Sequence, residues 1–330
     1  MGIPVKHLET ICFREELPEK KRFDALVEAA RTAMEATDPL VRPRDRKGFA
    51  GGFVRLSGPV PTIIVPDLHA RREFLLNVVR YRYSGETTVL EGLATGAVRV
   101  VCVGDAFHSE QRCRFRWLAA YEEYRAGILD GPSLTAEVAD SMGLMEMIME
   151  CIFAFPENFF FLKGNHENIL NTDKNGNHPF RKYAEEGEMF YRFFLSRFGK
   201  AFTTRYARFE NTFPLCVVGD RYMVSHAEPG RFYDEPSIIN ARLDPRLIRD
   251  FTWTGNGDSE EGTVEQMLAV FLPDVPDALY FGGHRPVAHS YALRASGRYV
   301  QIHDPYSGQV AFVPPDRPFD FTIDMRSVEP

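Results

Sequence analysis

Five short apolar segments of this 330-residue chain each lead directly into an Asp, His or Asn residue, and this feature restricts the fold most. The segments are PTIIVP (61–66), VRVVCVG (98–104), NFFFLKG (158–164), PLCVVGDRYMVSHA (214–227) and ALYFGGH (278–284). The polar residues at their ends are Asp67 with His69, Asp105, Asn165 with His166 and Glu167, His226, and His284. Ligand sites in open α/β sheets form beyond the carboxyl ends of strands. The five segments therefore predict strands that deliver their polar ends to one site.

The stretches between these segments have helical apolar spacing. They cover 70–82, 113–127, 135–152, 180–198 and 263–271. Strands are also expected at 298–303 and 309–313. Near-continuous apolar strands are typical of sheets that are covered on both faces. The sequence therefore predicts an α/β fold with helices on the outside.

The N-terminal part of the chain has a different character. Residues 19–36 are spaced as an amphipathic helix, whereas 38–58 are rich in Pro, Gly and Arg and predict a loop. We expect an N-terminal helical and loop extension over 1–55 and a catalytic domain over 56–330.

The residue types at the strand ends indicate a metal site. Carboxylate, imidazole and amide ligands without thiolate suit divalent Mn, Fe, Zn or Co. One carboxylate can bridge two ions, and two ions roughly 3.5–4 Å apart can clamp a transferring phosphoryl group. The five cysteines are scattered with no CxxC pair, which argues against a thiolate site.

The net charge and the hydropathy of the chain indicate which classes of partner it does not bind. The chain has 39 Lys and Arg against 46 Asp and Glu, a net charge of -7, so no nucleic-acid partner is expected. No apolar run approaches the roughly 18 residues of a membrane span, and the first residues lack a signal-peptide core. We expect a cytoplasmic protein with no membrane partner, and the oligomeric state stays open.

The ordered motifs DxH, GD, GNHE, His and GH resemble those of the calcineurin-like metallophosphoesterases. The run 156–167, PENFFFLKGNHE, is similar to PENFFLLRGNHE of their phosphoprotein (serine/threonine) phosphatase branch. The segments SHAEPG (225–230), FTWTGN (251–256) and HDPY (303–306) resemble further motifs of that branch. The resemblance covers roughly residues 60–315 and implies two packed mixed β-sheets flanked by helices.

The resemblance also implies a role for each matching residue. It assigns Asp67 and His69 to a first divalent ion, Asp105 to both ions, and Asn165, His226 and His284 to a second ion. Mn, Fe or Zn are the expected metals. A bridging hydroxide would attack phosphorus, and His166 would protonate the leaving oxygen as general acid. The implied activity is hydrolysis of phosphate monoesters, with phosphoserine and phosphothreonine in proteins as the expected substrates.

Several positions depart from the branch. Where it has GDxVDRG, this chain has GDAFHSE (104–110), so His108 replaces the Asp that supports the general acid and Ser109 replaces a phosphate-binding Arg. Glu110 is one candidate to support the acid instead. A further ligand that the wider family carries two residues after His284 is replaced by Pro286, as in the branch. No Arg occurs from 251 to 284, where the branch has a second phosphate-binding Arg. Candidate substrate-binding residues are Arg285, His108 and Tyr306.

Two other functions stay open. The same chemistry could act on a small phosphorylated molecule such as a dinucleoside polyphosphate, because a fold does not determine a substrate. A non-catalytic interaction scaffold on the same fold is the other alternative, although the complete ligand set argues against it. A nuclease or cyclic phosphodiesterase is disfavoured by Pro286 and by the acidic composition.

Overall fold

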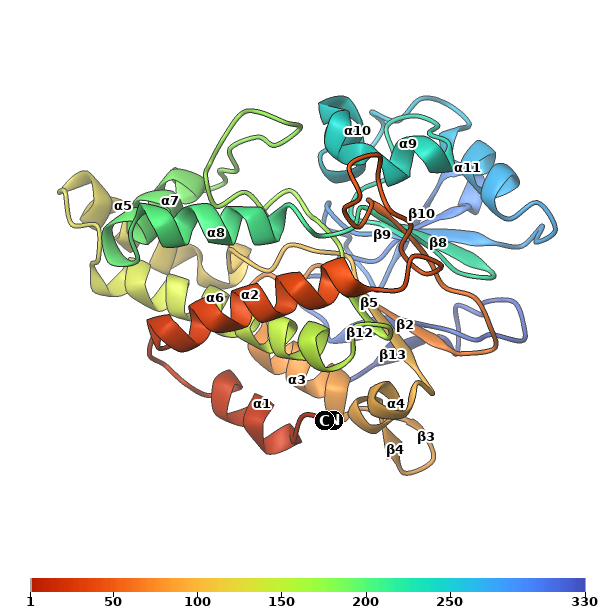
Figure 1. Ribbon diagram of the computed structural model, residues 1–330, viewed down its shortest axis with the longest axis horizontal. Helices are drawn as coiled ribbons and strands as arrows, with labels where there is room; N and C mark the ends of the chain where they lie inside the picture. Colours follow the sequence, from red (N-terminus) through yellow and green to blue (C-terminus); the bar gives the residue numbers. More distant parts are fainter. Residues whose placement is uncertain (1, 330) are drawn as a thin grey trace.

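Two β-sheets pack face to face at the centre of the computed structural model, which describes residues 2–329 (Figure 1). The six-stranded sheet has the order β1 (Phe53–Arg55), β7 (Cys216–Val218), β8 (Tyr222–Ser225), β9 (Leu279–Gly282), β11 (Tyr299–Gln301), β10 (Ala292–Arg294). The five-stranded sheet has the order β13 (Met325–Ser327), β12 (Gln309–Val313), β2 (Thr62–Val65), β5 (Arg99–Cys102), β6 (Phe159–Phe161). Both sheets are mixed, because parallel neighbours such as β2–β5–β6 and β8–β9–β11 are flanked by antiparallel strands.

Helices cover the outer face of each sheet. On the outer side of the five-stranded sheet lie α1 (Val5–Cys12), α2 (Lys20–Ala36), α3 (Arg72–Arg80), α4 (Val89–Thr95), α5 (Arg114–Arg125), α6 (Pro132–Ala154), α7 (Glu186–Arg197) and α8 (Lys200–Glu210). Of these, α4 and α6 contact the strands, and the others pack mainly against neighbouring helices. The six-stranded sheet is covered by α9 (Glu235–Ile239), α10 (Pro245–Thr252) and α11 (Thr263–Phe271). A small hairpin of β3 (Arg82–Ser84) and β4 (Thr87–Thr88) and three 3₁₀ turns at Glu110–Cys113, Ala241–Leu243 and Ala295–Gly297 complete the elements.

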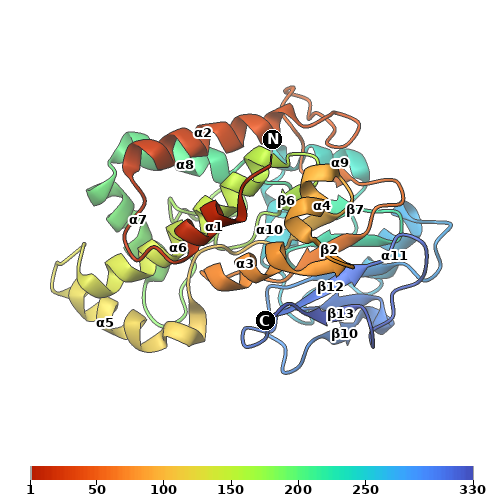
Figure 2. The ribbon, with the colours of Figure 1, turned by 90° about the horizontal axis from the view of Figure 1, so that it is seen from below.

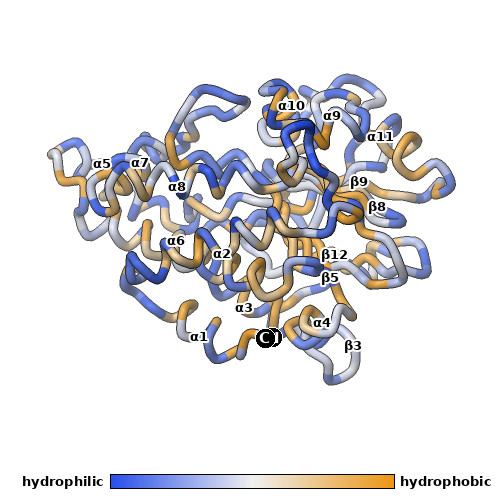
Figure 3. The backbone as a smooth tube through the Cα atoms, viewed as in Figure 1, coloured by the Kyte–Doolittle hydropathy of each residue, from blue (hydrophilic) through white to orange (hydrophobic). Residues whose placement is uncertain are grey.

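Three apolar clusters correspond to these layers. The middle cluster joins the facing sides of the two sheets and includes Ile64, Val101, Val224 and Phe281. The other two lie between each sheet and its helices. Figure 3 shows the backbone as apolar along much of the sheets and polar in the outer loops. The prediction of two packed mixed sheets flanked by helices is confirmed.

Most predicted elements are present, with three differences in detail. Residues 53–55 of the loop predicted over 38–58 form strand β1, because they pair with β7. The segment 214–227 forms two antiparallel strands, β7 and β8, rather than one run, because Gly219 and Asp220 lie in the connection between them. Residues 180–185 do not join the helix predicted over 180–198. The Glu186 carboxylate accepts the backbone N–H groups of Lys182 and Tyr183 there, and α7 starts only at Glu186.

The first two helices contribute to the main core. Leu8 of α1 and Phe23 and Val27 of α2 are buried in the same cluster as α6, α7 and α8. Both ribbon views show α2 running beside α8 (Figures 1 and 2). The ring of Phe23 lies 6.2 Å from that of Phe202 in α8. The described part of the predicted extension is therefore packed against the rest of the chain.

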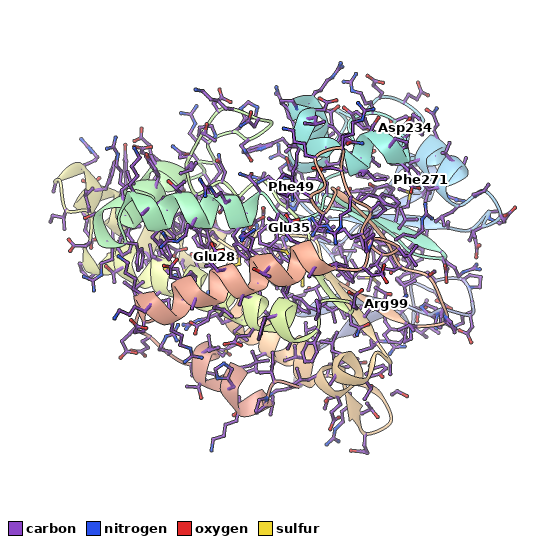
Figure 4. All side chains as sticks on the ribbon, viewed as in Figure 1. Glu28, Glu35, Phe49, Arg99, Asp234 and Phe271 are labelled. Carbon is purple, nitrogen blue, oxygen red and sulfur yellow. The ribbon has the colours of Figure 1, made fainter. Side chains whose placement is uncertain are left out.

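The loop after α2 is also fixed to the body of the protein. Figure 4 shows Glu35 at the end of α2 below the loop that carries Phe49. Its Oε2 accepts the backbone N–H of Ala50 at 2.8 Å, and its Oε1 lies 3.2 Å from the Arg242 guanidinium. Strand β1 then pairs with β7. These contacts connect the segment before residue 56 to the six-stranded sheet as well.

We expect Phe23→Ala to destabilise the whole protein by about 3–5 kcal/mol, because it removes a fully buried ring between helices. The measurement is urea unfolding followed by the fluorescence of Trp117 and Trp253, the only two tryptophans. Phe13→Ala is the matched control, since that ring is 61% exposed, and we expect a change within about 0.5 kcal/mol. An unchanged tryptophan transition in Phe23→Ala would mean that the extension unfolds separately.

No helix within residues 2–329 is long and apolar enough to cross a membrane.

Candidate metal centre

The six predicted metal ligands lie together at the carboxyl ends of five strands. Asp67 and His69 follow β2, Asp105 follows β5, and Asn165 follows β6. His226 follows β8 and His284 follows β9 of the other sheet. Strands β2, β5 and β6 are parallel neighbours, as are β8 and β9, so their ends meet at one edge where the sheets face each other.

Four of these side chains form one half of the centre. The Asn165 Oδ1 atom lies 2.9 Å from His226 Nε2 and 2.9 Å from His284 Nδ1. His226 Nε2 lies 3.5 Å from Asp105 Oδ2. An amide oxygen, two imidazole nitrogens and a carboxylate oxygen thus converge on one small volume. These are the four side chains that the resemblance assigns to the second ion.

The other half contains Asp67, His69 and Asp105. His69 Nε2 lies 3.6 Å from Asp105 Oδ2. Asp105 Oδ2 therefore lies between the His69 and His226 imidazoles, as a carboxylate shared by two ions would. Asp67 and His69 offer ligand atoms within 4.8 Å of each other and of a third residue, His303.

Unpaired buried atoms indicate that a cation fits these side chains. The Oδ2 atoms of Asp67 and Asp105 are buried and have no hydrogen-bond donor among the described residues. Burial raises the pKa of Asp105 well above its ordinary value, and the neighbouring Glu167 and Asp67 carboxylates raise it further. Buried carboxylates placed this close together need positive charge between them. The donor set therefore fits divalent metal ions.

Backbone carbonyls orient two of the candidate histidine ligands. His69 Nδ1 lies 3.2 Å from the Phe107 carbonyl, and His226 Nδ1 lies 3.0 Å from the Val103 carbonyl. Each Nδ1–H donates to its carbonyl, which leaves the Nε2 lone pair facing the cluster. Burial lowers the pKa of both His69 and His226 to about 3, so both rings are neutral, as metal ligands must be.

The turns after the strands bring the ligands into contact. Asp105 and His284 have left-handed backbones, with φ of 55° and 65°. Gly283 lies so close to Asp67 that a Cβ there would collide with the carboxylate. Glu167 accepts the backbone N–H groups of Asp105, Ala106 and Gly164 at 2.7–3.0 Å. This buried carboxylate thereby connects the ends of β5 and β6.

His166 lies at the rim of the cluster. Its side chain is 13% exposed, and its Nε2 lies 3.8 Å from Asp105 Oδ2. Its Nδ1 is buried without a hydrogen-bond partner among the described residues. Burial, and then the rings of His69 and His108, lower the pKa of His166 well below its ordinary value. The candidate general acid therefore has no carboxylate partner on Nδ1.

The two residues that could have supported His166, His108 and Glu110, make other contacts in the structure. His108 is fully buried, and its ring centre lies 5.3 Å from that of His166. Its Nδ1 accepts the Glu110 backbone N–H, and its Nε2 lies 3.4 Å from the Glu186 carboxylate. The Glu110 carboxylate instead contacts His303 and Lys182. Sequence reasoning missed Glu186, because it lies 78 positions from His108 and no motif surrounds it.

The proposed substrate-binding residues differ in accessibility. Arg285 is exposed beside the candidate ligand His284, and Tyr306 is 74% exposed. Tyr306 and the exposed Arg112 line a pocket of about 390 Å³, together with Ala70, which directly follows His69. The Arg112 guanidinium also donates to the His69 carbonyl at 3.1 Å. His108 is fully buried, so a substrate would have to reach it through the cluster.

Arg71 and Arg72 line the same pocket but are already engaged. The Arg71 guanidinium donates to the carbonyls of Asp67, Leu68, Asp304 and Ser307. Arg72 pairs with Asp140 at 2.7 Å. These two arginines therefore support the fold next to the centre.

Comparison with known proteins supports the fold. No family model and no curated protein matches the sequence. Among solved structures, a protein serine/threonine phosphatase from Saccharomyces cerevisiae, described as similar to human phosphatase PP5, superposes with a TM-score of 0.55. It is 14% identical, and the match covers 90% of this chain and 84% of that one. A cold-active protein-tyrosine phosphatase of a psychrophilic Shewanella matches with a TM-score of 0.48 at 12% identity, over 78% of this chain and 76% of that one. The sheet arrangement, the buried His and Asp clusters at its edge and the phosphatase superposition together show that this chain has the calcineurin-like metallophosphoesterase fold.

Proposed function

We propose that this chain is a phosphatase that uses two divalent ions to hydrolyse phosphate monoesters, with phosphoserine and phosphothreonine in proteins as its substrates. The observation that carries the proposal is the position of Asp105. Its unpaired Oδ2 lies 3.6 Å from His69 Nε2 and 3.5 Å from His226 Nε2. A carboxylate between two such ligand groups suits a pair of ions better than a single ion.

In this proposal Asp67 and His69 would hold the first ion, Asn165, His226 and His284 would hold the second, and Asp105 would be shared by both. Such ions would supply positive charge for the phosphoryl oxygens and lower the pKa of bound water. Asp105 Oδ1 accepts the His166 backbone N–H at 2.9 Å, so this carboxylate also positions the segment that carries His166. Reaction at phosphorus needs no protein nucleophile.

His166 protonates the leaving oxygen. Its position at the rim, with Nε2 facing Asp105, puts a proton donor beside the ions without making it a ligand. The negative charge of a bound phosphate monoester raises the pKa of this imidazole and so opposes the lowering by burial. The buried His108 ring packs beside the His166 ring, with the ring centres 5.3 Å apart, and it occupies the sequence position where the resemblance expects an Asp.

Exposed cations next to the centre hold the phosphate. Arg285 follows the ligand His284, and Arg112 donates to the carbonyl of the ligand His69. We assign phosphate contact to Arg285, with Arg112 as a second cation and Tyr306 as a contact for the rest of the substrate. The branch-like sequence around GNHE and HAEP favours a protein substrate.

The test is hydrolysis by purified, chelator-stripped protein resupplied with Mn, Zn, Co or Mg. The substrates are a phosphoserine peptide, p-nitrophenyl phosphate, bis-p-nitrophenyl phosphate and a dinucleoside polyphosphate. Metal-dependent hydrolysis of the peptide and of p-nitrophenyl phosphate is expected, with none in Asp105→Asn.

Each other outcome contradicts part of the proposal. Hydrolysis of the dinucleotide without the peptide would reject the protein substrate in favour of a small phosphorylated molecule. Turnover of the diester alone would identify a phosphodiesterase. No turnover by metal-loaded protein on any substrate would favour a non-catalytic scaffold.

A further inference from the structure

His303 lies beside the candidate metal centre, although no ligand motif predicts it there. It follows β11 by two positions, and its side chain is fully buried. Strand β11 is the parallel neighbour of β9, whose end carries His284. The His303 carbonyl accepts the Val287 backbone N–H at 2.9 Å, which aligns His303 with the turn that contains Pro286. The imidazole thus enters the cluster from the strand next to that turn.

The two ring nitrogens of His303 have different surroundings. Nε2 lies 3.1 Å from Glu110 Oε2 and donates its proton to that carboxylate. Nδ1 lies 3.5 Å from Asp67 Oδ2, and neither of these buried atoms has a hydrogen-bond partner among the described residues. A neutral imidazole that donates through one nitrogen offers a lone pair at the other. The Nδ1 lone pair therefore faces the same volume as the unpaired Asp67 oxygen.

We propose that His303 is a ligand of the first metal ion through Nδ1, oriented by Glu110. Asp67, His69 and His303 each offer one ligand atom, and these atoms all lie within 4.8 Å of one another. This inference rests on the proposed dinuclear centre and completes its first site. Pro286 has no ligand atom at the position where the wider family carries a further histidine, and His303 supplies an imidazole from the adjacent strand.

Glu110 is built into the centre as the orienting carboxylate. It is 7% exposed, and a left-handed backbone with φ of 52° turns its side chain inward. Lys182 Nζ lies 2.8 Å from its Oε1, which balances the buried charge. A carboxylate that fixes the ring of a metal-bound histidine is a common outer partner in metal sites.

The competing explanation is structural. A protonated His303 could simply neutralise Asp67 and Glu110 without touching metal. The two explanations differ in metal affinity and in the magnetic environment of the His303 ring, so both are measured.

The first measurement is the affinity of stripped protein for Co(II), by competition with a chromophoric chelator. We expect the wild type to bind two ions. We expect His303→Ala to weaken one of them by about 100-fold or more, and Glu110→Gln, which keeps the volume, by about 10–100-fold. His289→Ala is the matched control, because His289 is exposed, and its affinities should stay within about twofold of the wild type.

The second measurement counts the metal-bound histidines in the wild type, so the count does not depend on the folding of a variant. Nuclear magnetic resonance of Co(II)-loaded wild type, with nitrogen-15 in the histidines, reports rings bonded to the paramagnetic ion. We expect strongly shifted signals from four histidines: His69, His226, His284 and His303. Assignment uses their loss, one at a time, in the alanine variants.

The outcomes distinguish failure of the proposed dinuclear centre from failure of the proposed role of His303. Failure of the wild type to bind two ions would reject the proposed dinuclear function itself. Two ions with only three shifted histidines, or unchanged Co(II) affinity in a folded His303→Ala, would keep that function and overturn the role of His303.

Discussion

Replacing Asp105 by Asn is expected to stabilise the metal-free protein and to remove the stabilisation that divalent ions give the wild type. Asp105 is fully buried beside Asp67 and Glu167, and its pKa is raised above the value in the unfolded chain. The folded state then binds the proton more tightly than the unfolded state, so the free energy of unfolding falls as pH rises through the folded pKa. At neutral pH the neutral, isosteric Asn relieves this cost, and we expect a gain of about 1–3 kcal/mol without metal.

In the presence of metal, we expect Asp105→Asn to be less stable than the wild type rather than more stable. Ions that bind only the folded protein stabilise it by about 2.7 kcal/mol per site at 100 times the dissociation constant. Asp105→Asn loses the charge shared by both sites, so most of this gain should disappear, and kcat/KM should fall by about 10³-fold or more. Urea unfolding with and without Mn is the measurement. Equal stabilisation of variant and wild type by Mn would show that Asp105 is not a ligand.

His166→Asn is expected to separate catalysis from metal binding. The backbone N–H that Asp105 accepts is retained, and the lost imidazole is not one of the ligands, so both ions should still bind. A general acid contributes about 10²–10⁴-fold when the leaving group is a poor one. We therefore expect kcat on the phosphoserine peptide to fall by that factor. On p-nitrophenyl phosphate, whose leaving group scarcely needs a proton, the loss should be under about tenfold.

The ratio of the two losses is the decisive quantity, because it cancels differences in the amount of active protein. Metal content is measured on the same samples, and His289→Asn serves as the exposed control. Equal losses on the two substrates would remove His166 from the role of acid. Loss of an ion would make it a ligand instead.

The sequence grouped the candidate ligands of the centre because these residues are local to strand ends. Each apolar run delivers its polar residue to the same edge of a sheet, so the order along the chain was sufficient to group Asp67, Asp105 and His226. The helices predicted from apolar spacing are also present, apart from the start of α7. There the Glu186 carboxylate holds two backbone N–H groups of the preceding turn.

Other features depend on contacts between distant segments, and apolar spacing carries no information about them. The helical spacing of 19–36 predicts α2 but not that Phe23 packs against α8, nearly 180 positions later. The sequence places Arg71 and Arg72 directly after the DxH motif, but it does not show that the fold engages them with carbonyls and with Asp140. An arginine side chain can bind a substrate or stabilise the fold, and the groups that surround it determine which of the two it does.

By itself, then, the sequence determined the fold, the edge at which the site forms and six candidate ligands, because strand periodicity and short motifs are local properties. The tertiary structure alone decided how the departures from the motifs are accommodated. It joins His108 to Glu186 and His303 to Glu110 and Asp67, across separations of 78, 193 and 236 positions. The physical reason is that the role of a histidine depends on which groups face its two nitrogens. Those groups come from strands and loops that only the packing of the two sheets brings together.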